Sequence, residues 1–274
     1  MTAAVPGVGD RTVARRVGGG RTSGGRELPM WAPSLGLIAA LVVLWQVLSS
    51  TVFEGKGVFP PPLDVVGAVV DNRALYWRHT QTTLREAWPG FLWGNLIAIA
   101  LGFVAVAVPF LEKPILQLAV TVTALPIIAI GPIFQITLSG DAPKSALAGM
   151  AVFFTTLIGA IVGLRATDRR SIDVIRALGG TSATVLRKVR IRAALPDLFA
   201  ALRISAPAAV LGAIVGEFLG GNDNGLGIAL VSAQATAQTE KVWAAAFVAT
   251  ALAGVGYAAI ATAGRLLTPW APRR

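Results

Sequence analysis

The sequence has no cysteine and only one histidine among its 274 residues. Without cysteine the chain can form no disulfide, no thiolate metal site and no cysteine nucleophile. A single histidine also excludes a metal site built from several imidazoles. A phosphate-binding loop needs Gly-x4-Gly-Lys followed by Ser or Thr, but the one Gly-Lys pair, Gly55-Lys56, is followed by glycine. The sequence therefore predicts no catalytic residue, no cofactor site and no metal site.

Charged residues are scarce as well. They make up 14% of the chain, against 54% hydrophobic residues, and the mean hydropathy is +0.67. This is more apolar surface than one soluble core needs to bury. The net charge of +10 would suit nucleic acid if basic residues were interleaved with aromatic ones on a soluble module. Here they fall between long apolar runs, which indicates a lipid membrane and no nucleic-acid partner.

Six apolar stretches are long enough to cross a hydrocarbon core of about 30 Å, which takes about 20 helical residues. They cover residues 28–53, 87–111, 114–140, 145–164, 198–219 and 242–264. Arg203 interrupts the fifth near its start, where a long side chain can reach the headgroups. Residues 28–274 are therefore predicted to form an all-α membrane domain of about six transmembrane helices. Residues 1–27 are rich in Gly, Arg and Thr, and this composition predicts a disordered basic cytoplasmic tail.

The distribution of lysine and arginine predicts the orientation, because short basic loops stay on the cytoplasmic side. With both termini inside, the outer segments hold six of the 24 basic residues, and 24 − 6 = 18 lie inside. The outer six are Lys56, Arg73, Arg78, Arg85, Lys144 and Lys241. We therefore expect a multi-pass protein of the bacterial inner or plasma membrane with both termini in the cytoplasm.

Small residues and prolines recur inside the spans. Glycines four residues apart are typical of faces where helices pack closely; they are Gly90 with Gly94, Gly159 with Gly163, and Gly212 with Gly216. Pro126, Pro132 and Pro207 free backbone groups inside spans, which fits either a transport path or ordinary kinked packing. Glu217 is the one carboxylate that we place close to a span interior. A role near a pore or gate and simple capping at the interface both fit it.

The longest predicted cytoplasmic loop, residues 165–197, has the pattern of two short amphipathic helices. Ser171 can cap the first, Gly179-Gly180 ends it, and Thr181 or Ser182 can cap the second. The apolar stripes are Ile172, Ile175 and Leu178 in the first helix and Val185, Leu186 and Val189 in the second. A solvated loop would not need such stripes. The loop is therefore predicted to dock on another surface or to lie on anionic headgroups.

This loop also carries a family resemblance. Asp173-Val-Ile-Arg-Ala-Leu-Gly179-Gly-Thr, then Val189 and Ala193-Ala-Leu-Pro196-Asp-Leu-Phe-Ala-Ala-Leu-Arg203, resembles the EAA loop of binding-protein-dependent ABC importer permeases. Further matches between about Val58 and Leu267 are Phe59-Pro-Pro-Pro-Leu-Asp64, His79-Thr-Gln-Thr-Thr-Leu84, Leu125-Pro126, Gly216-Glu217-Phe-Leu-Gly220 and Gly225-Leu-Gly-Ile228. Together they look closest to the nitrate, sulfonate and taurine branch.

The sequence departs from the family pattern at two places in the loop. The family's Glu-Ala-Ala is Asp173-Val174-Ile175 here. Its Ile-x-Leu-Pro after the second short helix is Val189-Arg190-Ile191-Arg192, without the proline. Asp173 keeps a carboxylate and Gly179 keeps the break, so the resemblance still implies a coupling loop.

The resemblance implies a type I ABC importer permease (MetI-like) fold and a pore subunit that performs no covalent chemistry. It implies three protein partners: an ABC ATPase subunit, an extracytoplasmic solute-binding protein and a second permease subunit, with a homodimer expected. The coupling residues would be Asp173, Ala177, Leu178, Gly179, Gly180, Val185 and Val189. Pro126, Pro132 and Glu217 would lie at the pore or gate. The solute would be small, such as nitrate, a sulfonate or taurine, with selectivity mostly in the binding protein.

Two other classes of membrane protein remain open on the residues alone. An ion-coupled secondary transporter usually has paired ionisable groups near the midplane or two related halves, and we find neither pattern in the spans. A non-transporting scaffold would have no use for a docking loop with two apolar stripes. Co-purification with an ATPase separates the three classes.

Overall fold

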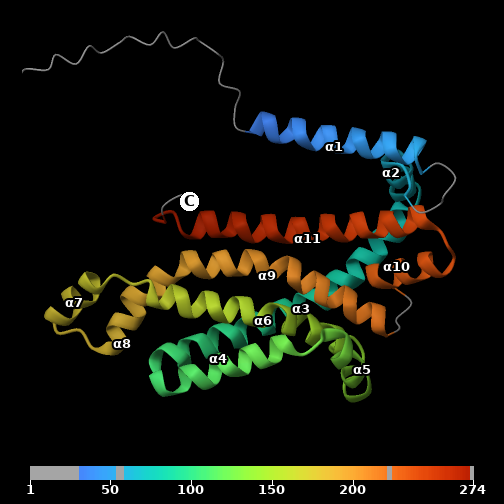
Figure 1. Cartoon of the computed structure of the whole chain (residues 1–274). Helices are drawn as coiled ribbons and strands as arrows, with labels where there is room; N and C mark the ends of the chain where they lie inside the picture. The colour runs from blue at the N-terminus through green and yellow to red at the C-terminus, as the bar shows by residue number, and fades with distance from the viewer. Residues whose placement is uncertain (1–30, 54–58, 221–223, 272–274) are drawn as a thin grey trace, which may run out of the picture. The chain divides into compact units, whose positions relative to one another are not determined.

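The computed structural model describes residues 31–53, 59–220 and 224–271. The predicted tail, residues 1–27, lies outside the described residues. The chain divides into two units, residues 1–44 and 45–274. The first unit contributes the beginning of helix α1 (Trp31–Thr51), and the second contains the other helices shown in Figure 1. The described secondary structure is helical, as predicted.

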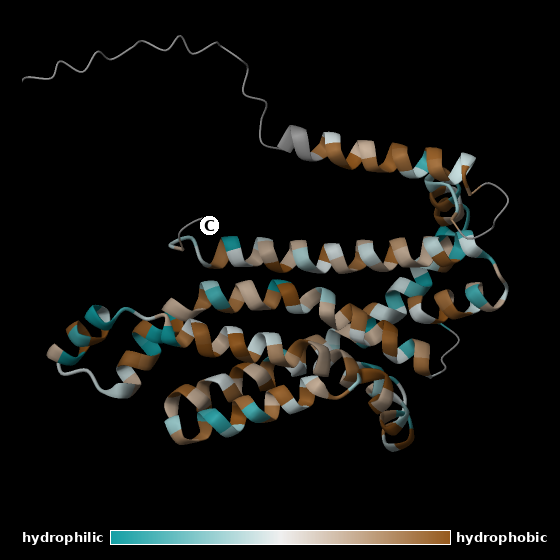
Figure 2. Ribbon diagram, in the orientation of Figure 1, coloured by the Kyte–Doolittle hydropathy of each residue, from teal (hydrophilic) through white to brown (hydrophobic). Residues whose placement is uncertain are grey.

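Four long helices dominate the second unit. They are α3 (Arg73–Ala107), α6 (Ala142–Arg165), α9 (Ile191–Leu219) and α11 (Thr239–Leu267). Each is long and apolar enough to cross a membrane, and Figure 2 shows their apolar residues along most of their lengths. The shorter α2 (Pro62–Asp71) and α10 (Leu226–Ala235) pack against α11. The prediction of an all-α membrane fold is confirmed.

The third predicted span, residues 114–140, is broken. It forms α4 (Pro109–Ala124) and α5 (Ile127–Thr137), whose axes bend by 93°. Pro126 explains the break, because proline disfavours helical backbone at the residue before it, and Leu125 is extended with φ −70° and ψ 124°. Counted as one span, the bent pair raises the membrane-crossing helices of the described residues from four to five. The apolar part of α1, Leu35–Thr51, is a shorter helix.

Close glycine contacts hold α6 between α3 and α9. A Cβ atom placed on Gly94 of α3 would lie 2.6 Å from the Gly149 carbonyl oxygen of α6. One placed on Gly212 of α9 would lie 2.7 Å from the Ala148 Cα. Gly159 of α6 meets Ala201 of α9 in the same way. These contacts confirm that the predicted small-residue faces are packing faces.

The predicted docking loop forms α7 (Arg169–Ala177), α8 (Ser182–Val185) and the π-helical turn η1 (Leu186–Arg190). The cap of α7 was predicted wrongly: Asp168 accepts from the Arg170 N–H at 3.2 Å, one turn before Ser171. Thr181 caps α8 as predicted, accepting from the Thr184 N–H at 3.4 Å.

The second short helix of the loop does not end before the fifth span. α8, η1 and α9 run on as one helical segment, Ser182–Leu219, of 38 residues. At 1.5 Å per residue such a segment is about 57 Å long. Arginine stands at position 192, where the family has proline, so no proline interrupts this junction. One element thus joins the loop to the opposite end of the bundle (Figure 1).

Candidate functional site

The first candidate site is the α7–η1 element, residues 168–190. Helix α7 ends in a Schellman turn, in which the Gly179 N–H donates to the Arg176 carbonyl and the Gly180 N–H to the Ile175 carbonyl, both at 2.9 Å. Gly179 has φ +81°, a conformation that side chains with a Cβ disfavour. A Cβ on Gly180 would lie 2.5 Å from the Ile175 Cγ2. The two glycines therefore set the sharp turn between α7 and α8.

The predicted loop residues differ in exposure, and we call the exposed group, Asp173, Val174, Ala177 and Leu178, the tip. Leu178 is 80% exposed and Val174 59% exposed, and Asp173 and Ala177 are exposed beside them. Val185, in contrast, is only 3% exposed, and Val189 is half-buried. The same element carries five exposed basic residues, Arg169, Arg170, Arg176, Arg187 and Lys188. An apolar tip on a predominantly basic element is suited to a docking surface with an apolar groove and acidic edges.

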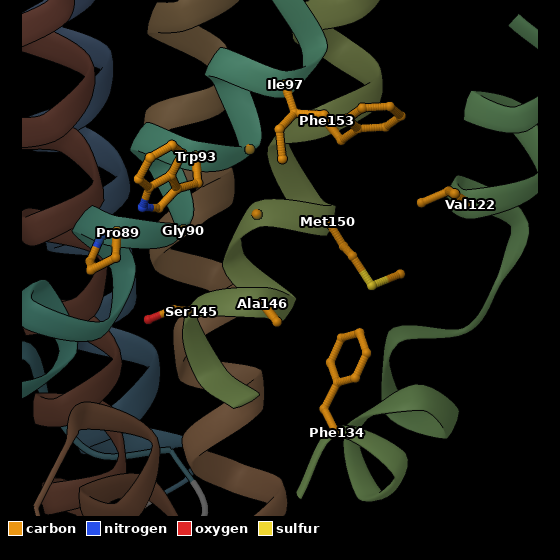
Figure 3. A pocket seen from close by; sticks show the side chains of 12 residues that line it. Pro89, Gly90, Trp93, Ile97, Val122, Phe134, Ser145, Ala146, Met150 and Phe153 are labelled. Carbon is orange, nitrogen blue, oxygen red and sulfur yellow. The ribbon is translucent and has the colours of Figure 1, made fainter. Parts of the chain in front are cut away.

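The second candidate site is a cavity of about 430 Å³ between α3, α6 and the bent pair α4 and α5. Figure 3 shows Trp93 of α3, Met150 and Phe153 of α6 and Phe134 of α5 around it. Pro126 and Pro132 do not line the cavity. Pro126 stands at the bend, between the lining residues Val122 and Phe134, and Pro132 lies inside α5.

Glu217 belongs to neither of these sites. Its side chain is fully buried near the end of α9, where it caps the N-terminus of α10. Oε1 accepts from the Thr83 hydroxyl at 2.5 Å and Oε2 from the Gly227 N–H at 2.6 Å. None of these residues lines the cavity, so the structure does not bring Glu217 together with Pro126 and Pro132.

A buried ion pair stands beside Glu217. Lys144 Nζ of α6 lies 2.7 Å from Glu86 Oε1 of α3, and the side chains are 2% and 0% exposed. This pair was not predicted from the sequence: Lys144 was expected in an outer segment, and Glu217 as the one carboxylate near a span interior. Helical spacing was the sequence signal from which part of this buried polar group could have been predicted. His79, Thr83 and Glu86 lie on one face of α3, in line with Gly90.

The known proteins that this chain resembles are membrane components of transport systems. The model of a family described as binding-protein-dependent transport system inner membrane component matches residues 86–271. The putative aliphatic sulfonates transport permease of Bacillus subtilis is 30% identical over 82% of this chain and 82% of its own length. The riboflavin transport system permease of Chloroflexus aurantiacus is 29% identical over 87% of this chain and 91% of its own.

A solved structure shares the fold. It is the MetNI methionine ABC transporter in inward-facing conformations, with a TM-score of 0.57 and 20% sequence identity. The match covers 73% of this chain and 98% of that one, which confirms the predicted permease fold. Because the family model spans more than half of the sequence, this chain belongs to the inner membrane components of binding-protein-dependent transport systems, the permeases of ABC transporters.

Proposed function

We propose that this chain is the translocation-pore subunit of an ATP-driven importer and that the α7–η1 element docks in a groove of the ATPase subunit. The continuity of Ser182–Leu219 carries the proposal. A docking element on the end of one long helix can move the far end of the bundle, because a helix transmits displacement along its axis. The exposed Leu178 and Val174 would enter the groove, and the exposed arginines of α7 and η1 would meet acidic edges.

ATP binding would shift the α7–η1 element and change the bundle between inward-facing and outward-facing states. Nucleotide can drive such a transition only through different affinities for the two states. The energy therefore enters through the ATPase partner, and the permease itself catalyses no reaction. The cavity beside the α4–α5 bend is our candidate for a section of the solute path, with Pro126 at the bend and Pro132 inside α5 as nearby pore residues.

The remaining partners follow from the same proposal. A second copy of the chain would complete the path as a homodimer, and an extracytoplasmic binding protein would deliver the solute. The charge distribution supports a cytoplasmic position for both termini and for the α7–η1 element, since 18 of the 24 basic residues are then inside.

For the solute we favour a small organic molecule, such as a sulfonate or taurine, over nitrate. The relatives' names include aliphatic sulfonates and riboflavin, both organic. The cavity presents aromatic and apolar side chains, including Trp93, Phe134 and Phe153, which suit a solute with an apolar part better than a bare inorganic ion.

One observation favours an ion-coupled transporter: Glu86 and Glu217 are two buried carboxyl residues in neighbouring helices. Lys144 compensates the charge of Glu86 within the protein, however. An exposed apolar tip such as Leu178 has no role in ion coupling, and we therefore favour the importer.

The experiment is uptake of labelled taurine into vesicles holding the chain, its ATPase and its binding protein. Leu178→Asp should abolish ATPase co-purification and uptake, because a charge replaces the apolar tip, whereas Leu178→Met should preserve both. Excess nitrate should not compete. Full uptake by well-inserted Leu178→Asp would reject the docking proposal, and competition by nitrate would reject the solute class.

A further inference from the structure

The N-terminus of α10 is held by side chains from other helices. The N–H groups of residues 225, 226 and 227 donate in turn to His79 Nδ1 at 2.9 Å, Thr83 Oγ1 at 2.9 Å and Glu217 Oε2 at 2.6 Å. The first N–H groups of a helix have no acceptor within it. Here α3 and α9 supply these acceptors, so α10 is capped by the bundle.

Glycine makes room for this arrangement. Gly225 has φ +140°, and a Cβ there would lie 2.4 Å from the Glu217 carboxyl carbon. A Cβ on Gly227 would lie 2.9 Å from the Glu217 Cβ. The carboxylate can therefore approach the α10 backbone only because both positions lack side chains.

A second layer connects Glu217 to α6. The carboxyl groups of Glu217 and Glu86 are close neighbours, and Lys144 donates to Glu86. The Ser145 hydroxyl also donates to the Glu86 carbonyl oxygen at 2.8 Å. We call the five residues His79, Thr83, Glu86, Lys144 and Glu217 the polar clamp. It joins α3, α6, α9 and α10 at the end of the bundle opposite the α7–η1 element (Figure 1).

Burying a lysine and two carboxyl side chains costs several kcal/mol per ion before their interactions are counted. A local Ser or Asn cap would satisfy a helix N-terminus without that cost. Capping of α10 alone therefore does not explain why the polar clamp contains buried charged residues. A rigid junction between four helices does explain them.

We propose that Glu217 and Thr83 are positioning residues that fix α10 to the continuous helix Ser182–Leu219, so that α10 moves together with the α7–η1 element. Glu217 lies in the last turn of that helix, and the α7–η1 element joins its other end. Helix α10 has ten residues and is too short to cross the bilayer. This inference rests on the proposed function.

The anchoring is tested on the purified chain without any partner. Thr83→Val keeps the shape of the side chain but removes the hydroxyl that bonds α10 and Glu217. Hydrogen–deuterium exchange of the first α10 amides should rise about tenfold, as expected for a lost buried hydrogen bond. Thr83→Ser should restore slow exchange. Thr82→Val is the matched control, because the Thr82 hydroxyl donates to Arg78 in its own helix. Unchanged exchange in Thr83→Val overturns the anchor.

The positioning role is tested in the complex with the ATPase and the binding protein. Thr83→Val should lower the solute moved per ATP hydrolysed about tenfold while hydrolysis continues, and Thr83→Ser should recover it. A structural role alone would lower uptake and hydrolysis together. If hydrogen exchange of α10 is faster but the solute moved per ATP is unchanged, the positioning role is wrong and the proposed importer function is unaffected. A wild-type complex without ATP-dependent uptake overturns the importer, while the exchange result still decides the anchor.

Discussion

Lys144→Met should lower the free energy of unfolding by about 3–5 kcal/mol, the usual cost of removing one partner of a buried ion pair. The variant keeps an unbranched side chain of similar length in the space beside Gly216, but it leaves Glu86 buried without its cation. Unfolding of the purified chain in mixed micelles, monitored by circular dichroism, measures the loss. Lys113→Met, at an exposed lysine, should change stability by less than about 0.5 kcal/mol.

The double variant Lys144→Met, Glu86→Gln separates lost charge pairing from lost packing. Removing both charges should recover much of the stability, because the cost of an isolated buried charge disappears. If Lys144→Met alone is as stable as the wild type, the buried pair contributes nothing to the fold. The polar clamp would then lose its α6 connection.

Gly179→Val should reduce uptake more than tenfold at normal expression. The positive φ of Gly179 costs a residue with a Cβ roughly 1–2 kcal/mol, and branching at Cβ adds to this. The turn would open and displace α7 and its apolar tip, while the membrane helices stay intact. Gly179→Asn should keep most of the uptake, because asparagine tolerates this conformation. Transport assays on equal amounts of inserted protein compare the two, and equal uptake by both variants would contradict a role for the turn.

Some of these features could be predicted from the sequence because they depend on local patterns. The apolar runs predicted the membrane helices, and Gly179-Gly180 with its flanking stripes predicted two helices and a turn. Pro126 shows the limit of hydropathy, since residues 114–140 carry no charge and the 93° break depends on one residue. The cap prediction at Ser171 failed because Asp168, another good capping residue, starts α7 one turn earlier.

The polar clamp could be predicted only in part. The spacing of His79, Thr83 and Glu86 places them on one face of α3, which a helical projection of the sequence reveals. Their partners, Lys144, Glu217 and Gly225, come from three distant segments, and local sequence carries no signal for that pairing. In the sequence, Lys144 has the features of an ordinary loop lysine. Its burial depends on the packing of α6 against α3, which the local sequence does not indicate.

Cross-linking from position 178 is the most direct test of the central claim, that the α7–η1 element binds the ATPase. The natural chain has no cysteine, so Leu178→Cys gives a single labelling site. A short thiol-directed photo-cross-linker there should capture the ATPase subunit, and the yield should change when ATP binds. Leu63→Cys, 71% exposed on α2, should capture none. Capture of lipid alone from position 178, in a complex that still transports solute, would contradict the account.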